Sequence, residues 1–159
     1  MTDIRKSLNV FTTSVEVGQI AEISAAGPSS QTVKLVTGSV ATLVPGRPVK
    51  LVTGAGNVPL VELAVPGTDD IYGLVLFNPK VASWVENYIL QVSGKDTVLY
   101  LAASESLARG AQVGLNTSTY KLIAATQTNY IGRLLDEATN DAVVRVQLDV
   151  PLGASLASA

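Results

Sequence analysis

The sequence contains no cysteine and no histidine among its 159 residues. Without cysteine it forms no disulfides, holds no thiolate-bound metal and offers no cysteine nucleophile, which suits assembly in a reducing cytoplasm. Without histidine it lacks the side chain most often used as a general base near neutral pH, and the commonest metal ligand. We therefore expect a protein that is not an enzyme, with no catalytic residues, no cofactor and no metal site.

Charged residues are also scarce. They make up 15% of the chain, against about 25% in typical soluble domains. Eleven basic and thirteen acidic residues are spread without long runs, and the basic stripe of a nucleic-acid-binding protein is missing. A surface with so few charges is poorly protected against association. The composition favours a surface that other subunits cover, and the alternative is a compact monomer for which few charges suffice.

Long hydrophobic runs are missing as well. Each apolar stretch spans only a handful of residues, whereas a helix that crosses a bilayer needs about 20. The charged start of the chain is followed by Ser7, Leu8 and Asn9 rather than by the apolar core of a secretion signal. We predict no membrane partner and synthesis in the cytoplasm.

The apolar residues that are present follow the period of β strands. Val144, Val146 and Leu148 alternate with polar residues, as expected of a half-buried strand. Further strands are predicted at 32–37, 49–53, 60–65, 71–77, 88–92, 97–101, 120–125 and 130–135, with turn-forming residues between them. This spacing predicts a mostly β fold, a compact barrel or sandwich of short antiparallel strands. A minor helical content is predicted at 81–86 and at 104–109, the second ending at Gly110.

The chain also resembles itself. Residues 34–38 (KLVTG) recur at 50–54, and a looser pattern relates the two halves. Residues 43–49 (LVPGRPV) parallel 107–113 (LARGAQV), and 71–76 (IYGLVL) parallel 130–135 (YIGRLL). In both halves a glycine turn leads into a strand, and an internal glycine allows a bulge or a close backbone approach. The alternative is chance similarity among strands rich in valine and glycine.

The two ends differ from the middle. Residues 1–31 contain few strong strand signals and finish in a linker-like stretch, 32–150 form the predicted β domain, and 151–159 are a tail of small residues. Spaced apolar residues in the first segment favour an extended N-terminal arm that contacts a neighbour. The predicted partner-binding residues are Ile4, Leu8, Val10, Phe11, Val15, Val17 and the single tryptophan, Trp84. In the alternative reading the segment forms the first strands of the same domain. For Trp84, a position in the core is the more ordinary reading.

Two acidic pairs and one serine–lysine pair are candidates for reactive groups. Asp69 with Asp70, and Asp136 with Glu137, lie at predicted turns or strand ends, where solvated acids are common. Adjacent residues of a strand also point to opposite faces. Ser93 and Lys95 fit a hairpin turn better than a nucleophile and its base. None of these pairs is predicted to be catalytic.

Part of the pattern resembles a known family. Residues 45–49 (PGRPV), 69–76 (DDIYGLVL), 107–113 (LARGAQV), 130–138 (YIGRLLDEA) and 143–148 (VVRVQL) resemble the small decoration, or cement, proteins of tailed-bacteriophage capsids. The resemblance runs from Leu43 to Leu148. It departs at 85–89, where that family has an alanine–glycine turn and this chain has Asn87, which tolerates a left-handed backbone.

The resemblance implies a β-barrel-like domain and a structural role in a virion. We would expect a homotrimer that binds the major capsid protein on the outside of the shell, stabilises the capsid, and is made in the host cytoplasm. The alternative is a β-barrel binding module of a head fibre or tail component that contacts carbohydrate or a receptor. Another virion part, such as a baseplate subunit, is a third reading.

Overall fold

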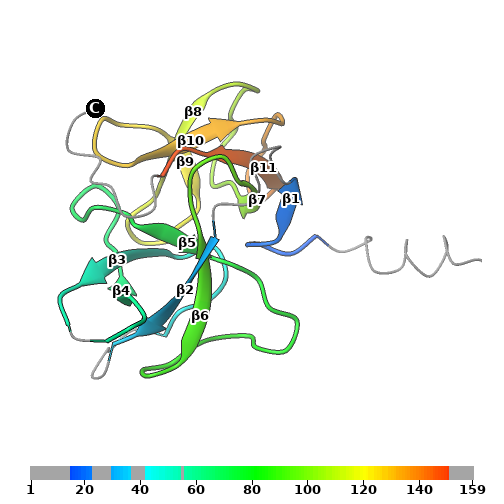
Figure 1. Ribbon diagram of the computed structural model, residues 1–159. Helices are drawn as coiled ribbons and strands as arrows, with labels where there is room; N and C mark the ends of the chain where they lie inside the picture. Colours follow the sequence, from blue (N-terminus) through cyan, green and yellow to red (C-terminus); the bar gives the residue numbers. More distant parts are fainter. Residues whose placement is uncertain (1–14, 23–29, 37–41, 55, 151–159) are drawn as a thin grey trace, which may run out of the picture.

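The computed structural model describes residues 15–22, 30–36, 42–54 and 56–150. Within these residues the secondary structure is entirely β, which confirms the predicted fold class (Figure 1). The strands are β1 Ile20–Glu22, β2 Ser30–Leu35, β3 Pro48–Val52, β4 Leu60–Leu63, β5 Gly73–Val75, β6 Ile89–Ser93, β7 Val98–Ala102, β8 Gln112–Leu115, β9 Leu122–Ala124, β10 Tyr130–Leu134 and β11 Val143–Leu148. Nine of them overlap the predicted strands, whereas β1 and β8 were not predicted.

The first half of the chain forms a closed barrel in the order β2-β4-β3-β5-β6. All its strand pairs are antiparallel except β2 with β4. Alternation along the strands explains the core: Leu90 and Val92 of β6 point inward, while Ile89 and Gln91 are exposed. Trp84, 3% exposed, packs among the buried side chains of this barrel.

The second half forms a sheet in the order β1-β7-β11-β10-β8-β9. A parallel bridge between Ala103 and Leu122 joins the end of β7 to β9, so this sheet also returns on itself. Strands β7 to β11 therefore have the same order and orientation as β2 to β6, with β1 added beside β7. Figure 1 shows the two units one above the other, the first below and the second above.

The two halves correspond residue by residue. Lys34 pairs with Ile89 in the first unit as Ala102 pairs with Val143 in the second, and the next four pairs of each ladder keep the same register. The turn glycines Gly46 and Gly110 have φ of 84° and 82°. The structure therefore has the half-chain duplication that the sequence pattern suggested. The shorter KLVTG repeat has no structural counterpart, because Leu35 is fully buried whereas Leu51 is 49% exposed.

Asn87 has a φ of 68°. This left-handed backbone was predicted, because Asn87 stands where the decoration proteins have an alanine–glycine turn. Its counterpart in the second unit is Asp141, with a φ of 63°. Both residues lie in the turn that leads into the last strand of their unit, and each donates its backbone N–H to the end of the unit's first strand, at Leu35 and Ala103.

The prediction of helix at 81–86 and 104–109 was wrong. Trp84 exchanges two backbone hydrogen bonds with Leu43, of 2.8 and 2.9 Å, and Leu107 does the same with Ala138. Six residues make a marginal helix at best, since helix nucleation is costly. Pairing across the barrel end satisfies the same backbone groups and buries Trp84 and Leu107, so the extended form prevails.

The connection between the units is short. The turn at Ser93 to Asp96 was predicted to join a hairpin, but β6 and β7 belong to different sheets and do not pair. Lys95 N–H and Asp96 N–H donate to the carbonyls of Val150 and Leu148, which fixes this connection to the end of β11. Leu74 and Leu76 of the first half are buried in the core of the second half, whereas Val75 belongs to the separate core of the first barrel, so β5 contributes side chains to both cores.

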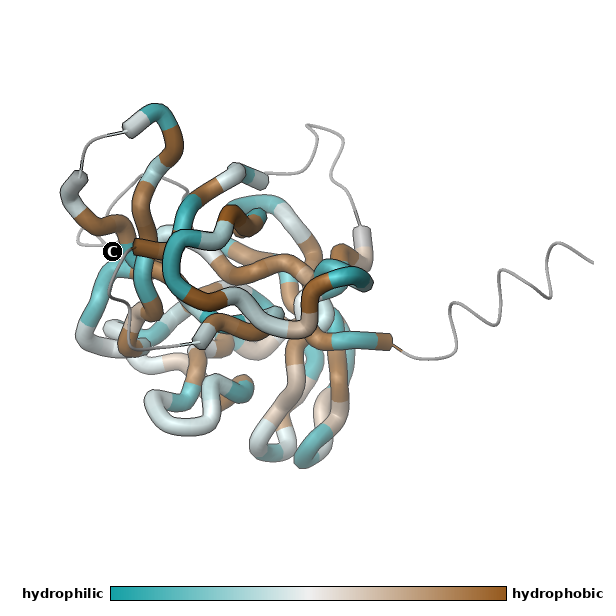
Figure 2. The backbone as a smooth tube through the Cα atoms, turned by 90° about the horizontal axis from the view of Figure 1, so that it is seen from below, coloured by the Kyte–Doolittle hydropathy of each residue, from teal (hydrophilic) through white to brown (hydrophobic). Residues whose placement is uncertain are grey.

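Residues 15–22 pack on the second unit, and β1 pairs with β7 of the same chain. The part of the predicted arm that the structure describes thus belongs to the first strands of this molecule. Residues 1–14 and the predicted tail at 151–159 lie outside the described residues. In Figure 2 the hydrophilic segments lie mainly in the peripheral loops, whereas the strands carry most of the hydrophobic segments.

Candidate functional site

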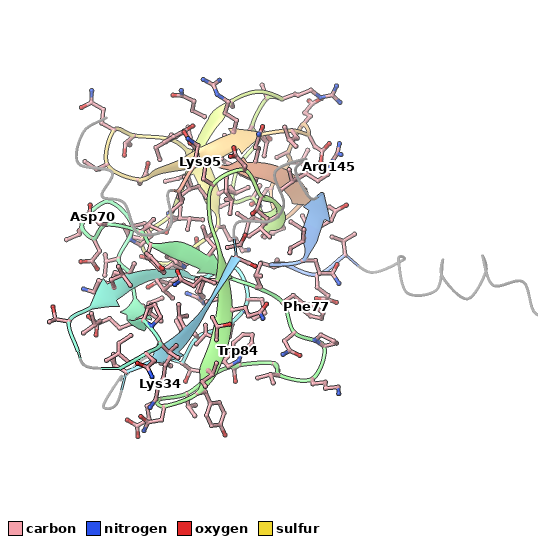
Figure 3. All side chains as sticks on the ribbon, in the orientation of Figure 1. Lys34, Asp70, Phe77, Trp84, Lys95 and Arg145 are labelled. Atoms are coloured by element: carbon pink, nitrogen blue, oxygen red, sulfur yellow. The ribbon has the colours of Figure 1, made fainter. Side chains whose placement is uncertain are left out.

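A cleft of about 840 Å³ opens between β1 and the outer face of the first barrel. Gly18 to Ala21 form one wall, and Ile89 and Gln91 of β6 contribute to the floor. Phe77 and Asn78, which follow β5, line the cleft as well. Figure 3 shows Phe77 beside β6 and below β1 in this view.

Backbone pairing fixes the wall of this cleft. Gly18 N–H donates to the Tyr100 carbonyl over 2.8 Å, and Tyr100 N–H donates to the Gln19 carbonyl over 3.0 Å. Phe77 N–H donates to the Gly18 carbonyl over 2.9 Å. The segment is therefore held by both units at once, because Tyr100 lies in β7 and Phe77 follows β5. Such a wall is part of the folded body rather than a loose flap.

The described lining of the cleft is uncharged. Among the fourteen described residues that line it, none is an aspartate, glutamate, lysine or arginine. Val15, Ile20 and Ile89 are 40%, 38% and 60% exposed, so apolar surface faces the solvent along the rim. The amides of Gln19 and Gln91 and the hydroxyl of Thr32 provide neutral hydrogen-bonding groups. This chemistry suits an extended peptide segment with apolar and small polar side chains.

The predicted partner-binding residues divide into three groups. Ile4, Leu8, Val10 and Phe11 lie outside the described residues. Val15 lines the cleft, while Val17 is half-buried and packs against the core of the second unit.

Trp84 is a core residue in this chain, as the more ordinary reading of the sequence had it. Only 3% of the side chain is exposed, which leaves little surface for a partner, although one edge reaches the cleft.

Sequence reasoning missed the cleft residues Phe77, Ile89 and Gln91. The run Tyr88-Ile89-Leu90 is apolar throughout, so its alternation does not reveal which side chain points outward. The strand prediction at 88–92 was right, but the face that β1 approaches follows from tertiary packing alone. The one usable signal was the uncharged composition of residues 87–93.

The first acid of each acidic pair has structural partners. Asp69 accepts hydrogen bonds from Lys50 Nζ at 3.1 Å and from Val65 N–H at 2.8 Å. Burial raises the pKa of Asp69, but these two donors outweigh it and leave the pKa below its usual value. Asp136 receives Nη2 of Arg145 at 2.7 Å and Nε at 3.0 Å, and these hydrogen bonds lower the pKa of Asp136. Each first acid thus ties its own unit together.

The serine and the lysine of the third pair lie in different surroundings. Ser93 is fully buried and donates its hydroxyl to Thr97 Oγ1 over 2.7 Å. Lys95 is exposed in the connection between the units. Among the described residues no three histidine, cysteine, aspartate or glutamate side chains gather as metal ligands. In the same residues no helix has the length and hydropathy of a membrane span.

The architecture is a tandem of two small β barrels, each with its own core. Neither a protein-family model nor a curated protein sequence matches the chain. Among solved structures, the fold is similar to the crystal structure of the N base of head fibre gp8.5 from bacteriophage phi29. The TM-score is 0.51 at 14% sequence identity, and the match covers 77% of this chain and 94% of that chain. At this identity the likeness shows a shared fold.

Proposed function

We propose that this chain is a structural protein of a bacteriophage virion that binds the outside of the capsid as an oligomer and stabilises the shell. The observation that carries the proposal is the fold: nearly the whole of a phage head fibre base superimposes on this tandem barrel. The sequence resemblance to capsid decoration proteins runs from Leu43 to Leu148, which spans most of the same two barrels. Both lines of support concern proteins of the phage head.

The chemistry of the described surface fits a role without a reaction. The first acid of each acidic pair is bound to a basic side chain of the same unit, and Ser93 is buried. A decoration protein acts by binding the assembled shell and not its free subunits, which stabilises the shell by mass action. An oligomer that bridges several capsid subunits sums modest contacts into tight attachment. We propose a homotrimer with the major capsid protein as its partner.

Cosedimentation with undecorated capsids tests this proposal. Purified protein is mixed with capsids at low and at physiological salt, and the pellet is assayed for saturable binding. The decorated capsids are then heated beside bare ones. We expect saturable binding and a higher temperature of capsid disruption. Protein that stays in the supernatant at every salt concentration would rule out the capsid as its partner.

A second candidate is the base of a head fibre, which the phi29 likeness favours directly. A fibre base also binds the capsid, but its task is to hold a further binding module, so it need not stabilise the shell. The same heating experiment separates the two functions. Saturable binding without any rise in disruption temperature would favour the fibre base over the decoration protein.

A further inference from the structure

The duplication provides an internal comparison for the cleft. Leu76 N–H donates to the Gln91 carbonyl in the first unit as Leu135 N–H donates to the Arg145 carbonyl in the second. Phe77 therefore corresponds to Asp136, and Gln91 corresponds to Arg145. The fold places an aromatic ring and an amide in one unit where it places an ion pair of 2.7 Å in the other.

The outer surface of the barrel at these positions can therefore carry charged side chains. In the second unit Asp136 and Arg145 are each about one-third exposed and cover that face with a charged pair. In the first unit the corresponding residues are uncharged, and Ile89 beside them is 60% exposed. Barrel folding does not require this apolar surface, so the difference points to something that covers it.

The chain itself provides a segment of matching chemistry. Val15 lines the cleft and is the first described residue, so residues 1–14 start from its rim. Residues 7–14 (SLNVFTTS) contain no charge and combine three apolar side chains with serine, threonine and asparagine. Extended, eight residues span about 26 Å at ~3.3 Å each.

The same sequence argues against return to the molecule's own cleft. Such a return requires a tight reversal just before β1, and tight turns prefer glycine, proline, asparagine or aspartate. Residues 11–17 contain none of these. The glycine that follows, Gly18, is already used, with a φ of 85°, in the turn that directs the chain into β1.

We propose that the cleft between β1 and β6 binds residues 7–14 of a neighbouring copy of the same chain. Apolar side chains of the segment cover Ile20 and Ile89, and its backbone faces the neutral amides and hydroxyl of the cleft. Each copy gives one segment and receives one, either reciprocally in a two-fold dimer or head-to-tail around a closed ring of subunits. This inference concerns self-association and stands whether or not the protein binds a capsid.

Cross-linking tests the exchange, since the absence of native cysteine leaves a clean background. Full-length Val10→Cys and Ile89→Cys variants are purified separately, mixed and treated with a short thiol-to-thiol cross-linker. We expect linked pairs that contain one copy of each variant. A Val10→Cys/Ile89→Cys double variant that links only within single copies would place the segment in its own cleft and overturn the proposal.

A matched pair of charge substitutions gives the second test. Ile89→Lys puts a charge into the cleft, whereas Val143→Lys puts one at the corresponding, 37% exposed position of the second unit. Light scattering after size-exclusion chromatography should find Ile89→Lys dissociated at concentrations at which Val143→Lys and the parent chain remain oligomeric. Equal masses for both variants, or a parent chain that is monomeric until capsids are added, would show that a copy of the chain does not occupy the cleft.

Discussion

Alanine substitutions at the two turn glycines can measure how closely Val17, in the segment before β1, packs against the first of these turns. Gly46 and Gly110 occupy the same turn in the two units with nearly the same φ. A methyl group at Gly110 meets no atom within 4 Å, whereas at Gly46 it would lie 2.5 Å from a methyl of Val17 and 3.2 Å from one of Leu101. Alanine at either position suffers the same backbone strain, but only Gly46→Ala also crowds Val17.

The expected magnitudes follow from this difference. A left-handed backbone costs a non-glycine residue about 1–2 kcal/mol, and this should be the whole effect of Gly110→Ala. Overpacking a filled interior typically adds about 1–3 kcal/mol, so Gly46→Ala should lose the sum of the two. For a chain of this size each kcal/mol corresponds to about 2–4 °C in Tm. We therefore expect Gly46→Ala to unfold at a clearly lower temperature than Gly110→Ala.

Urea unfolding followed by circular dichroism gives the free energies, and Val17→Ala completes the measurement. Removal of the Val17 methyls should recover part of the loss in Gly46→Ala and none of the loss in Gly110→Ala. This coupling is read from a double-mutant cycle. Equal losses for the two glycine variants, with no coupling to Val17, would refute the packing of the segment against the turn.

Three further predictions follow from single sites. Asp136→Asn should lose about 0.5–1 kcal/mol at pH 7, because the pair with Arg145 is partly exposed. Since the folded pKa of Asp136 lies below the ordinary value of 3.8, the pair stabilises the fold fully above that value, and the difference should shrink as unfolding is measured at lower pH. Trp84→Ala should lose about 3–5 kcal/mol in urea unfolding, as expected when a buried aromatic ring is truncated; a loss below 1 kcal/mol would contradict its burial. Gly132→Ala should destabilise the chain more than Gly110→Ala in thermal melts, because its methyl would meet backbone atoms of Gln147 and Leu148, which cannot move aside.

The β class and most strand positions were predictable because they depend on local alternation. The ladder at 143–148 shows this best: Val144, Val146 and Leu148 are buried, as their spacing predicted. The half-chain duplication was also visible, since its glycine turns are sequence signals. β1 escaped prediction because its three residues carry no strong pattern, and its place beside β7 follows from long-range packing.

The candidate site was only partly predictable. Val15 was identified from the spacing of apolar residues in the first segment, and the structure places it at the cleft. Phe77, Ile89 and Gln91 come together there through β5 and β6, and β1 arrives from the other unit. No sequence pattern predicts that β1, which pairs with the second barrel, also lies beside the outer face of the first. This placement depends on the backbone hydrogen bonds that Gly18 makes with Tyr100 and Phe77, which are far apart from it in the sequence.

The closure of both sheets has a consequence for contact between molecules of this chain in solution. A sheet with long open edges recruits strands from other molecules, and a sequence with 15% charged residues has little repulsion with which to prevent this. The first sheet closes through β2 and β4, and the second through Ala103 and Leu122. Closure thus shields most of the described backbone of a sparsely charged protein from uncontrolled stacking at high concentration, apart from the outer edge of β1, which pairs only with β7.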